Sequence, residues 1–316
     1  MAGISACLAF SLSLAADESL RQTPVELVRQ AVNNEVASDT GAGSHFMFRD
    51  TRTTARESQI KLVVETRDAT AGMLIAQDGH PLTPQQQRAE EARLENYIRH
   101  PDELTKKRKQ EKEDGDRTLR ILKALPDAFL YEPTGTVPAS SDMGRLGHEL
   151  VRLKFRPNPS YQPPSHVEQV LTAMKGNLLI DEQEKRIALM DGTLEKEVGF
   201  GWGILGHLDP GGHFVVQQAD VANGRWEVTR MELAFTGKIL LVKKLNLHSS
   251  DVFSDFHIVP STLTFAEGVE LLKKEMAKPA ATLPEAPPSE SKAVGIDGQH
   301  GDHQQKNRAE ECLVCN

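Results

Sequence analysis

The fold is decided by the stretch Trp226-Glu227-Val228-Thr229-Arg230-Met231-Glu232-Leu233. Apolar and polar residues alternate along it, which is typical of a β-strand with one buried face and one face in water. Similar segments continue on both sides of it and are separated by turn residues such as Asp181-Glu182-Gln183-Glu184 and Ala222-Asn223-Gly224. A run of antiparallel β-hairpins is therefore predicted over residues 169–258.

Further strands and helices are expected around this run. Within it, strands are predicted at Leu171–Ile180, Arg186–Val198, His213–Val221, Trp226–Phe235 and, after a turn at Thr236-Gly237, Lys238–Asn246. Before it, strands are predicted at 45–52, 58–67, 72–77, 128–132 and 148–156. Apolar residues at helical spacing predict helices at 23–36, 84–99, 102–124 and 264–277, the last with Thr264 as N-cap. The expected fold class is α+β, mainly antiparallel β.

The beginning of the chain predicts export. Residues 4–14 form an uncharged apolar run that is too short to span a bilayer and ends in the small residues Ser13-Leu14-Ala15. We therefore expect a signal peptide at 1–15, a periplasmic folded domain at 16–277, and a disordered Pro-, Ser- and Glu-rich tail at 278–316. The n-region has no Lys or Arg, and Ile4-Ser5-Ala6-Cys7 leaves lipidation of Cys7 as an alternative.

Composition excludes some classes of protein. A net charge of −8 and a pI near 5.8 argue against a nucleic-acid-binding protein, which would carry a concentrated basic face. No other segment is apolar enough for a permanent transmembrane span. Once Cys7 is removed only Cys312 and Cys315 remain, so the core is expected to have no disulfide. No motif calls for a cofactor.

Residues 84–124 form a charged helical insert. The run Lys106-Lys107-Arg108-Lys109 is compatible with contact to an anionic surface. Acidic residues follow within the same helix and cancel most of this charge, which favours a solvated helix face.

The tail contains the chain's densest group of metal-ligand residue types. His300 and His303 are followed by Cys312 and Cys315 in a C-x-x-C pattern. Three interpretations remain open: a metal site, a disulfide or redox pair, and an incidental cluster in a disordered tail.

Other candidate groups in the folded region favour structural roles. Gly199, Gly201, Gly203 and Gly206 around Trp202 lack the spacing of a phosphate-binding loop, and they indicate a bend in a strand. His207 and His213 bracket Asp209-Pro210-Gly211-Gly212, which is compatible with a metal-binding hairpin but favours a turn with exposed histidines.

Two further patterns were tested for catalytic chemistry. Asp255 and His257 are two residues apart on one strand, as in a catalytic pair, but no nucleophile motif accompanies them. His148-Glu149 lacks the second histidine of a zinc-peptidase motif. We therefore predict no catalytic residues, no metal ligands in the folded domain, and no enzymatic activity.

The first hairpin of the run resembles a known superfamily. Asn177-Leu178-Leu179-Ile180-Asp181, a turn, and Arg186-Ile187-Ala188 are similar to a hairpin of the lipoprotein carrier superfamily, which sorts outer-membrane lipoproteins. Phe200-Gly201-Trp202-Gly203-Ile204-Leu205 and Phe253-Ser254-Asp255-Phe256 look like segments of exported bacterial proteins of the same type. The resemblance implies a curved half-barrel sheet covered by helices around an apolar cavity for acyl chains. The charged insert 84–124 departs from this pattern, and no ligand residue is carried over.

These observations predict a periplasmic, non-catalytic protein that binds a lipid acyl chain or a lipidated polypeptide. The first alternative is an envelope sensor or protein-interaction module that uses the same sheet, with 84–124 as its contact surface. The second is an enzyme with an unrecognised site.

Overall fold

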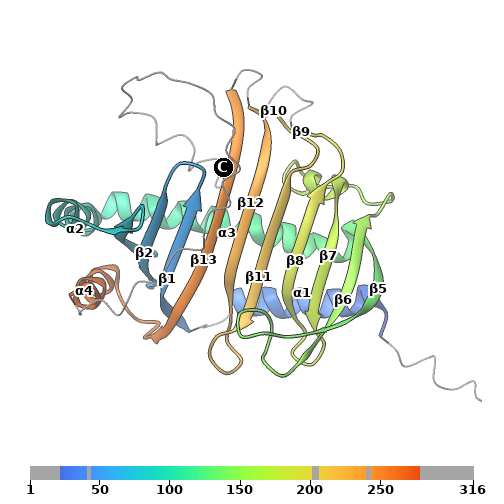
Figure 1. Ribbon diagram of the computed structural model, residues 1–316, viewed down its shortest axis with the longest axis horizontal. Coiled ribbons are helices and arrows are strands. Elements are labelled where there is room, and N and C mark those ends of the chain that lie inside the picture. Colours follow the sequence, from blue (N-terminus) through green and yellow to red (C-terminus); the bar gives the residue numbers. More distant parts are fainter. Residues whose placement is uncertain (1–21, 41–43, 201–205, 240–242, 278–316) are drawn as a thin grey trace, which may run out of the picture.

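A computed structural model describes residues 22–40, 44–200, 206–239 and 243–277. Within these residues, thirteen strands join in one sheet with antiparallel pairing, accompanied by four α-helices and one 3-10 helix (Figure 1). The predicted α+β, mainly antiparallel fold class is confirmed. None of the described helices combines the length and the apolar character that a membrane crossing requires.

The sheet brings the two ends of the folded chain together in its middle. Strand β1 pairs with β13, and the hairpins of the N-terminal and C-terminal parts extend from them in opposite directions. The order is β4-β3-β2-β1-β13-β12-β11-β8-β7-β6-β5, and the short strands β9 and β10 extend from β12. The bounds are β1 His45–Thr54, β2 Ser58–Val64, β3 Ala71–Gln77, β4 His80–Pro81, β5 Phe129–Pro138, β6 Glu149–Pro157, β7 Met174–Asp181, β8 Arg186–Leu194, β9 Val198–Phe200, β10 Gly206–Leu208, β11 His213–Asp220, β12 Trp226–Ile239 and β13 Lys243–Val259.

The helices lie where their sequence patterns predicted them. They are α1 Pro24–Thr40, α2 Pro84–Arg99, α3 Pro101–Ala128 and α4 Phe265–Met276. Helix α4 begins at a capping box in which Thr264 accepts from the Glu267 amide and Glu267 accepts from the Thr264 amide, so the predicted N-cap is confirmed. In Figure 1, α3 crosses behind the sheet from the α2 end towards β5.

One face of the sheet is covered by α1, and we call it the α1 face. Pairing across β5, β6, β7 and β8 places Leu153, Leu178 and Met190 on this face in one row. These side chains pack with Val28 and Ala31 of α1 and with the end of α3 in the largest buried cluster. The core at this end of the sheet is therefore a layer of strands under two helices.

At the other end of the sheet the opposite face is buried, and we call it the α4 face. The pairing of β1, β13 and β12 places Lys61 and Val63 of β2 on the α1 face. Leu62 and Val64 alternate with them and therefore point to the α4 face. Leu62 and Val64 pack with Leu94 of α2 and with residues of α4. A Cβ atom on Gly268 would lie 2.7 Å from Thr66 Cγ2, so this glycine allows α4 to approach β2 closely.

The edge of the sheet at β3 is protected by side chains from the helices. The Leu74 amide donates to Glu90 of α2 at 3.2 Å, and the Gly72 carbonyl accepts from Arg93 at 2.7 Å. The Thr70 amide donates to Glu111 of α3 at 3.1 Å. The charged insert 84–124 thus satisfies backbone groups that would otherwise invite pairing with another strand.

Several predicted boundaries are wrong. The strand predicted over Arg186–Val198 ends at Leu194, and the one predicted at 128–132 continues to Pro138. Thr236-Gly237 is not a turn, because β12 continues through it to residue 239. A Cβ on Gly237 would lie 2.1 Å from the His207 carbonyl oxygen, so the glycine admits the neighbouring strand β10. The strand predicted from Leu171 begins only at Met174, because residues 168–173 form a 3-10 helix whose Leu171 and Ala173 enter the core.

Candidate functional site

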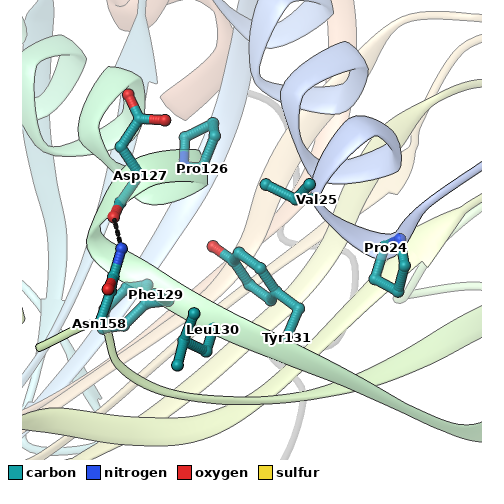
Figure 2. A pocket seen from close by; sticks show the side chains of 8 residues that line it. All are labelled: Pro24, Val25, Pro126, Asp127, Phe129, Leu130, Tyr131 and Asn158. Atoms are coloured by element: carbon teal, nitrogen blue, oxygen red, sulfur yellow. Dashed lines mark hydrogen bonds between the residues drawn. The ribbon is translucent and has the colours of Figure 1, made fainter. Parts of the chain in front are cut away.

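One shallow cleft, lined mostly by apolar side chains, lies at the β5 edge of the sheet (Figure 2). It lies between the beginning of α1, the end of α3 and β5, and its volume is about 390 Å³. That volume is within the range of roughly 300–1,000 Å³ that is usual for small-molecule sites. Its lining is Pro24, Val25, Pro126, Asp127, Phe129, Leu130, Tyr131 and Asn158.

Polar groups of this cleft are held at its margin. The Asn158 side-chain amide donates to the Asp127 carbonyl at 2.9 Å, and Arg29 of α1 forms an ion pair with Asp127 at 2.9 Å. The Tyr131 hydroxyl donates to the Leu125 carbonyl at 2.7 Å, and burial raises the pKa of its phenol. Tyr131 is therefore a neutral, fixed wall of the cleft rather than an acid or base.

Tyr131 also begins a row of residues that crosses the α1 face. The register runs from Tyr131 through Phe155, Gly176, Gly192 and Phe214 to Leu233. The row leaves the part of the sheet under α1 and reaches β12, where its side chains are only partly buried. An adjacent row continues the apolar surface with Met190, Val216 and Met231, which are also partly buried.

Glycines on these strands make room for aromatic rings. A Cβ on Gly192 would lie 2.3 Å from Phe214 Cε1, and a Cβ on Gly212 would lie 2.5 Å from Phe235 Cδ1. The rings of Phe214 and Phe235 therefore occupy space directly above glycine backbone. Both rings also pack against the buried cluster under α1.

The segment Phe253-Ser254-Asp255-Phe256 adds an aromatic group to the same face. A bulge in β13 opposite β1 places Asp255 at φ +56°, in the left-handed region. The extra residue lets Phe253 and Phe256, which are three residues apart, both contact Phe48, with ring centroids 5.9 and 5.4 Å away. Asp255 forms an ion pair with Arg49 at 2.9 Å. Asp255, weighed above with His257 as a catalytic pair, thus has Arg49 as its charged partner.

A buried charge cluster joins α1 to the middle of the sheet. Arg186 of β8 donates to both carboxylate oxygens of Glu35 of α1, at 2.9 and 2.7 Å, and both side chains are buried. Burial, and then the nearby Glu65 carboxyl, raise the pKa of Glu227 to about 7. Burial also raises the pKa of Glu65, whose carboxylate accepts from the Phe46 amide at 2.9 Å. The cluster has three carboxyl groups and one guanidinium, so part of it is protonated near neutral pH.

A second pair of carboxyl groups lies further along the α1 face. Arg52 donates to the fully buried Asp251 at 2.5 Å, and burial together with the Asp251 charge raises the pKa of Asp50. The polar groups here are supplied by β1 and β13, next to the aromatic group around Phe48. The α1 face is therefore apolar under α1, whereas at β1 it carries both charged and aromatic side chains.

The motif that resembles the lipoprotein carrier superfamily has a structural role here. Asp181 accepts from the amides of Gln183 and Glu184 at 3.0 Å and contacts His148 at 2.8 Å. Arg186 is the partner of Glu35 described above. The two charged residues of the motif therefore hold the β7–β8 turn and fasten α1 to the sheet, and His148 is engaged by Asp181.

His207 and His213, which bracket the predicted turn, contact different carboxylates in the structure. His213 of β11 bonds to Asp191 of β8 at 2.8 Å. His207 lies beside Asp209, and the structure adds Glu197, which sequence reasoning missed because it precedes the glycine-rich segment. Their donor atoms all lie within 4.8 Å of one another.

The remaining candidates do not form a site in the described part of the chain. Lys107, Lys109 and Lys112 pair with acidic residues four positions later in α3, as expected for a solvated helix face. Gly199 and Gly206 lie in β9 and β10, whereas Gly201, Trp202 and Gly203 lie outside the described residues. His300, His303, Cys312 and Cys315, the signal-peptide segment 1–15 and the tail from 278 also lie outside them.

Comparisons with known proteins leave the family open. No protein-family model matches the chain, and no curated protein matches it. Among solved structures, a DUF1329 family protein from Desulfovibrio piger is similar over 75% of this chain and 94% of that chain, with 9% identity and a TM-score of 0.26. A similarity this distant carries no argument about function.

Proposed function

We propose that this chain is an exported, non-catalytic binding protein that holds the acyl chain of a lipid or lipidated polypeptide against its α1 face. The observation that carries the proposal is the apolar cleft between α1, α3 and β5. An acyl chain gains about 0.8 kcal/mol for each methylene that it buries, so an apolar cleft of this size favours such a ligand.

The surface beyond the cleft supports the same ligand. The row that starts at Tyr131 leads from the cleft to partly buried apolar residues on β11 and β12. Phe214 and Phe235 continue the apolar surface there and are only partly buried where they pack on the core. In this proposal the sheet is the curved half-barrel of a carrier, and α1 and α3 flank the way in.

The first test is native mass spectrometry of the full chain purified from the envelope fraction of its own cells. We expect an added mass that matches a lipid and is lost after extraction with organic solvent. A bare polypeptide mass would contradict the proposal and favour the interaction module.

A second test localises the ligand with two valine substitutions. Val25 lines the cleft, whereas Val252 is 45% exposed on the α4 face of β13. In the delipidated full chain, Val25→Glu should weaken palmitate binding at least about tenfold, since it places a charge in the path of several methylenes. Val252→Glu should leave binding unchanged. Equal affinities in the two variants would exclude the cleft as the binding site.

A further inference from the structure

Three possible metal ligands lie together at the paired strands β9 and β10, with Glu197 just before β9, His207 in β10 and Asp209 just after β10. His207 lies opposite Gly199 of β9 and Lys238 of β12, while Glu197 is two residues before Gly199 and Asp209 two after His207. Their donor atoms lie within 4.8 Å of one another, so all three side chains meet on one side of this hairpin. It is the α4 face, since Leu208, which lies between His207 and Asp209, packs into the core under α1.

We propose that Glu197, His207 and Asp209 bind a divalent metal ion of the zinc class. One donor atom of each lies within 4.8 Å of those of the other two. One imidazole nitrogen and two carboxylate oxygens suit Zn²⁺, and three protein ligands leave positions for water. The site is independent of the acyl-chain cleft, which lies on the other face.

The local geometry distinguishes His207 from two other histidines that contact a carboxylate. His148 and His213 each bond to an aspartate at 2.8 Å. His207 Nε2 lies 3.3 Å from Asp209 Oδ1, and this contact lacks the alignment of a hydrogen bond. The two groups are close without satisfying each other, as expected of ligands directed at a common third point.

Asp209 is also held in place by a neighbour. The Thr236 hydroxyl donates to Asp209 Oδ2 at 2.8 Å, and the Asp209 amide donates to the Thr236 carbonyl at 2.9 Å. Oδ1 therefore remains directed towards His207, an arrangement that resembles the second layer of contacts around metal ligands. The His207 side chain is 22% exposed and that of Asp209 is 42% exposed, so an ion can reach the site from solvent.

The charge of the group favours a cation. Two carboxylates beside a neutral imidazole carry two negative charges within a few ångströms. The exposed Lys238, opposite His207 in the ladder, offsets part of this charge. A divalent ion would neutralise the carboxylates and fasten the three-residue strands β9 and β10 to β12.

The test is a Zn²⁺ titration of the full chain, followed by competition with a chromophoric chelator. Because the tail also carries cysteines, all variants are made in a chain with Cys312→Ser and Cys315→Ser. His207→Gln should weaken Zn²⁺ binding by more than about tenfold, and Thr236→Val by about tenfold, the usual effect of losing a group that positions a ligand. The matched control His213→Gln should bind Zn²⁺ as the parent does.

Two outcomes would overturn the proposal. One is an unchanged Zn²⁺ affinity in His207→Gln, and the other is an equal loss in His207→Gln and His213→Gln. If His207→Gln fails to fold, Glu197→Gln serves in its place, because Glu197 is exposed and its substitution leaves the strands intact. Full Zn²⁺ affinity in that variant would equally exclude the site.

Discussion

The two ends of this sheet are built from similar strands, but their helices cover opposite faces. At the β5–β8 end the α4 face is also buried, by the segment that carries Val137, Ala139 and Met143. At the β5–β8 end, α1 covers the α1 face, and Leu153, Leu178 and Phe155 enter the core. At the β1–β3 end, α2 and α4 cover the other face, and Leu62 and Val64 enter the core. The middle strands β11, β12 and β13 lie between these helical layers, and most of their side chains are partly or fully exposed.

The difference teaches that alternation along a strand does not decide which face becomes the core. A strand with alternating residues has one apolar face. The helix that packs against the sheet determines which face of the sheet is buried there. Between the two helical layers, most side chains of the middle strands are only partly buried. The apolar row from Tyr131 ends in this region, and it is where we expect the bound acyl chain to extend.

The largest predicted effect compares a buried ion pair with an exposed one. Arg186→Met should lower the free energy of unfolding by roughly 3–5 kcal/mol, because it leaves Glu35 buried without its partner. Arg49→Met should change it by less than about 1 kcal/mol, because its partner Asp255 is 59% exposed. Denaturant unfolding of both variants measures the difference. Equal effects would show that the Glu35–Arg186 pair does not join α1 to the sheet.

The next prediction asks whether the two ends unfold separately. Leu178→Ala and Leu94→Ala remove leucines of equal burial from the two cores, and each should cost roughly 2–5 kcal/mol. In native-state hydrogen exchange, Leu178→Ala should reduce protection mainly in β6, β7 and β8. Leu94→Ala should do so mainly in β2 and β3. The same loss of protection across all strands in both variants would contradict the division into two ends.

A smaller effect concerns the charge cluster between the ends. The folded-state pKa of Glu227 is raised from 4.5 to about 7, so its protonated form stabilises the fold. The folded state holds this proton after the unfolded state has released it. Stability from Glu227 is therefore full below about pH 4.5 and lost as the pH rises towards 7, by roughly 3 kcal/mol in total.

Glu227→Gln tests this pH dependence. The variant keeps a neutral side chain at every pH, so its stability should fall less than that of the wild type between pH 5 and about pH 8. Denaturant midpoints across this range measure the effect. Parallel pH profiles for the two proteins would show that Glu227 is ionised in the folded state at neutral pH.

The sequence by itself determined the local elements of this protein. Alternation and helical spacing located most strands and the helices α1, α2, α3 and α4, and Thr264 marked the beginning of α4. These signals are local, since each depends on residues within a few positions of one another. The same reasoning wrongly predicted a turn at Gly237. That glycine is needed for close packing against β10, a strand some thirty residues away, and not for a turn between its sequence neighbours.

Tertiary structure alone decided which face each helix covers and which distant residues meet. The Glu35–Arg186 pair, the cleft walled by Val25 and Tyr131, and the grouping of Glu197 with His207 all join separate elements. No periodicity predicts them, because their partners are set by strand order and register. The physical reason is that the hydrophobic effect is non-directional, so apolar side chains are stabilised by burial against any apolar surface. A buried charge or a metal ligand is stabilised only when one particular partner lies beside it.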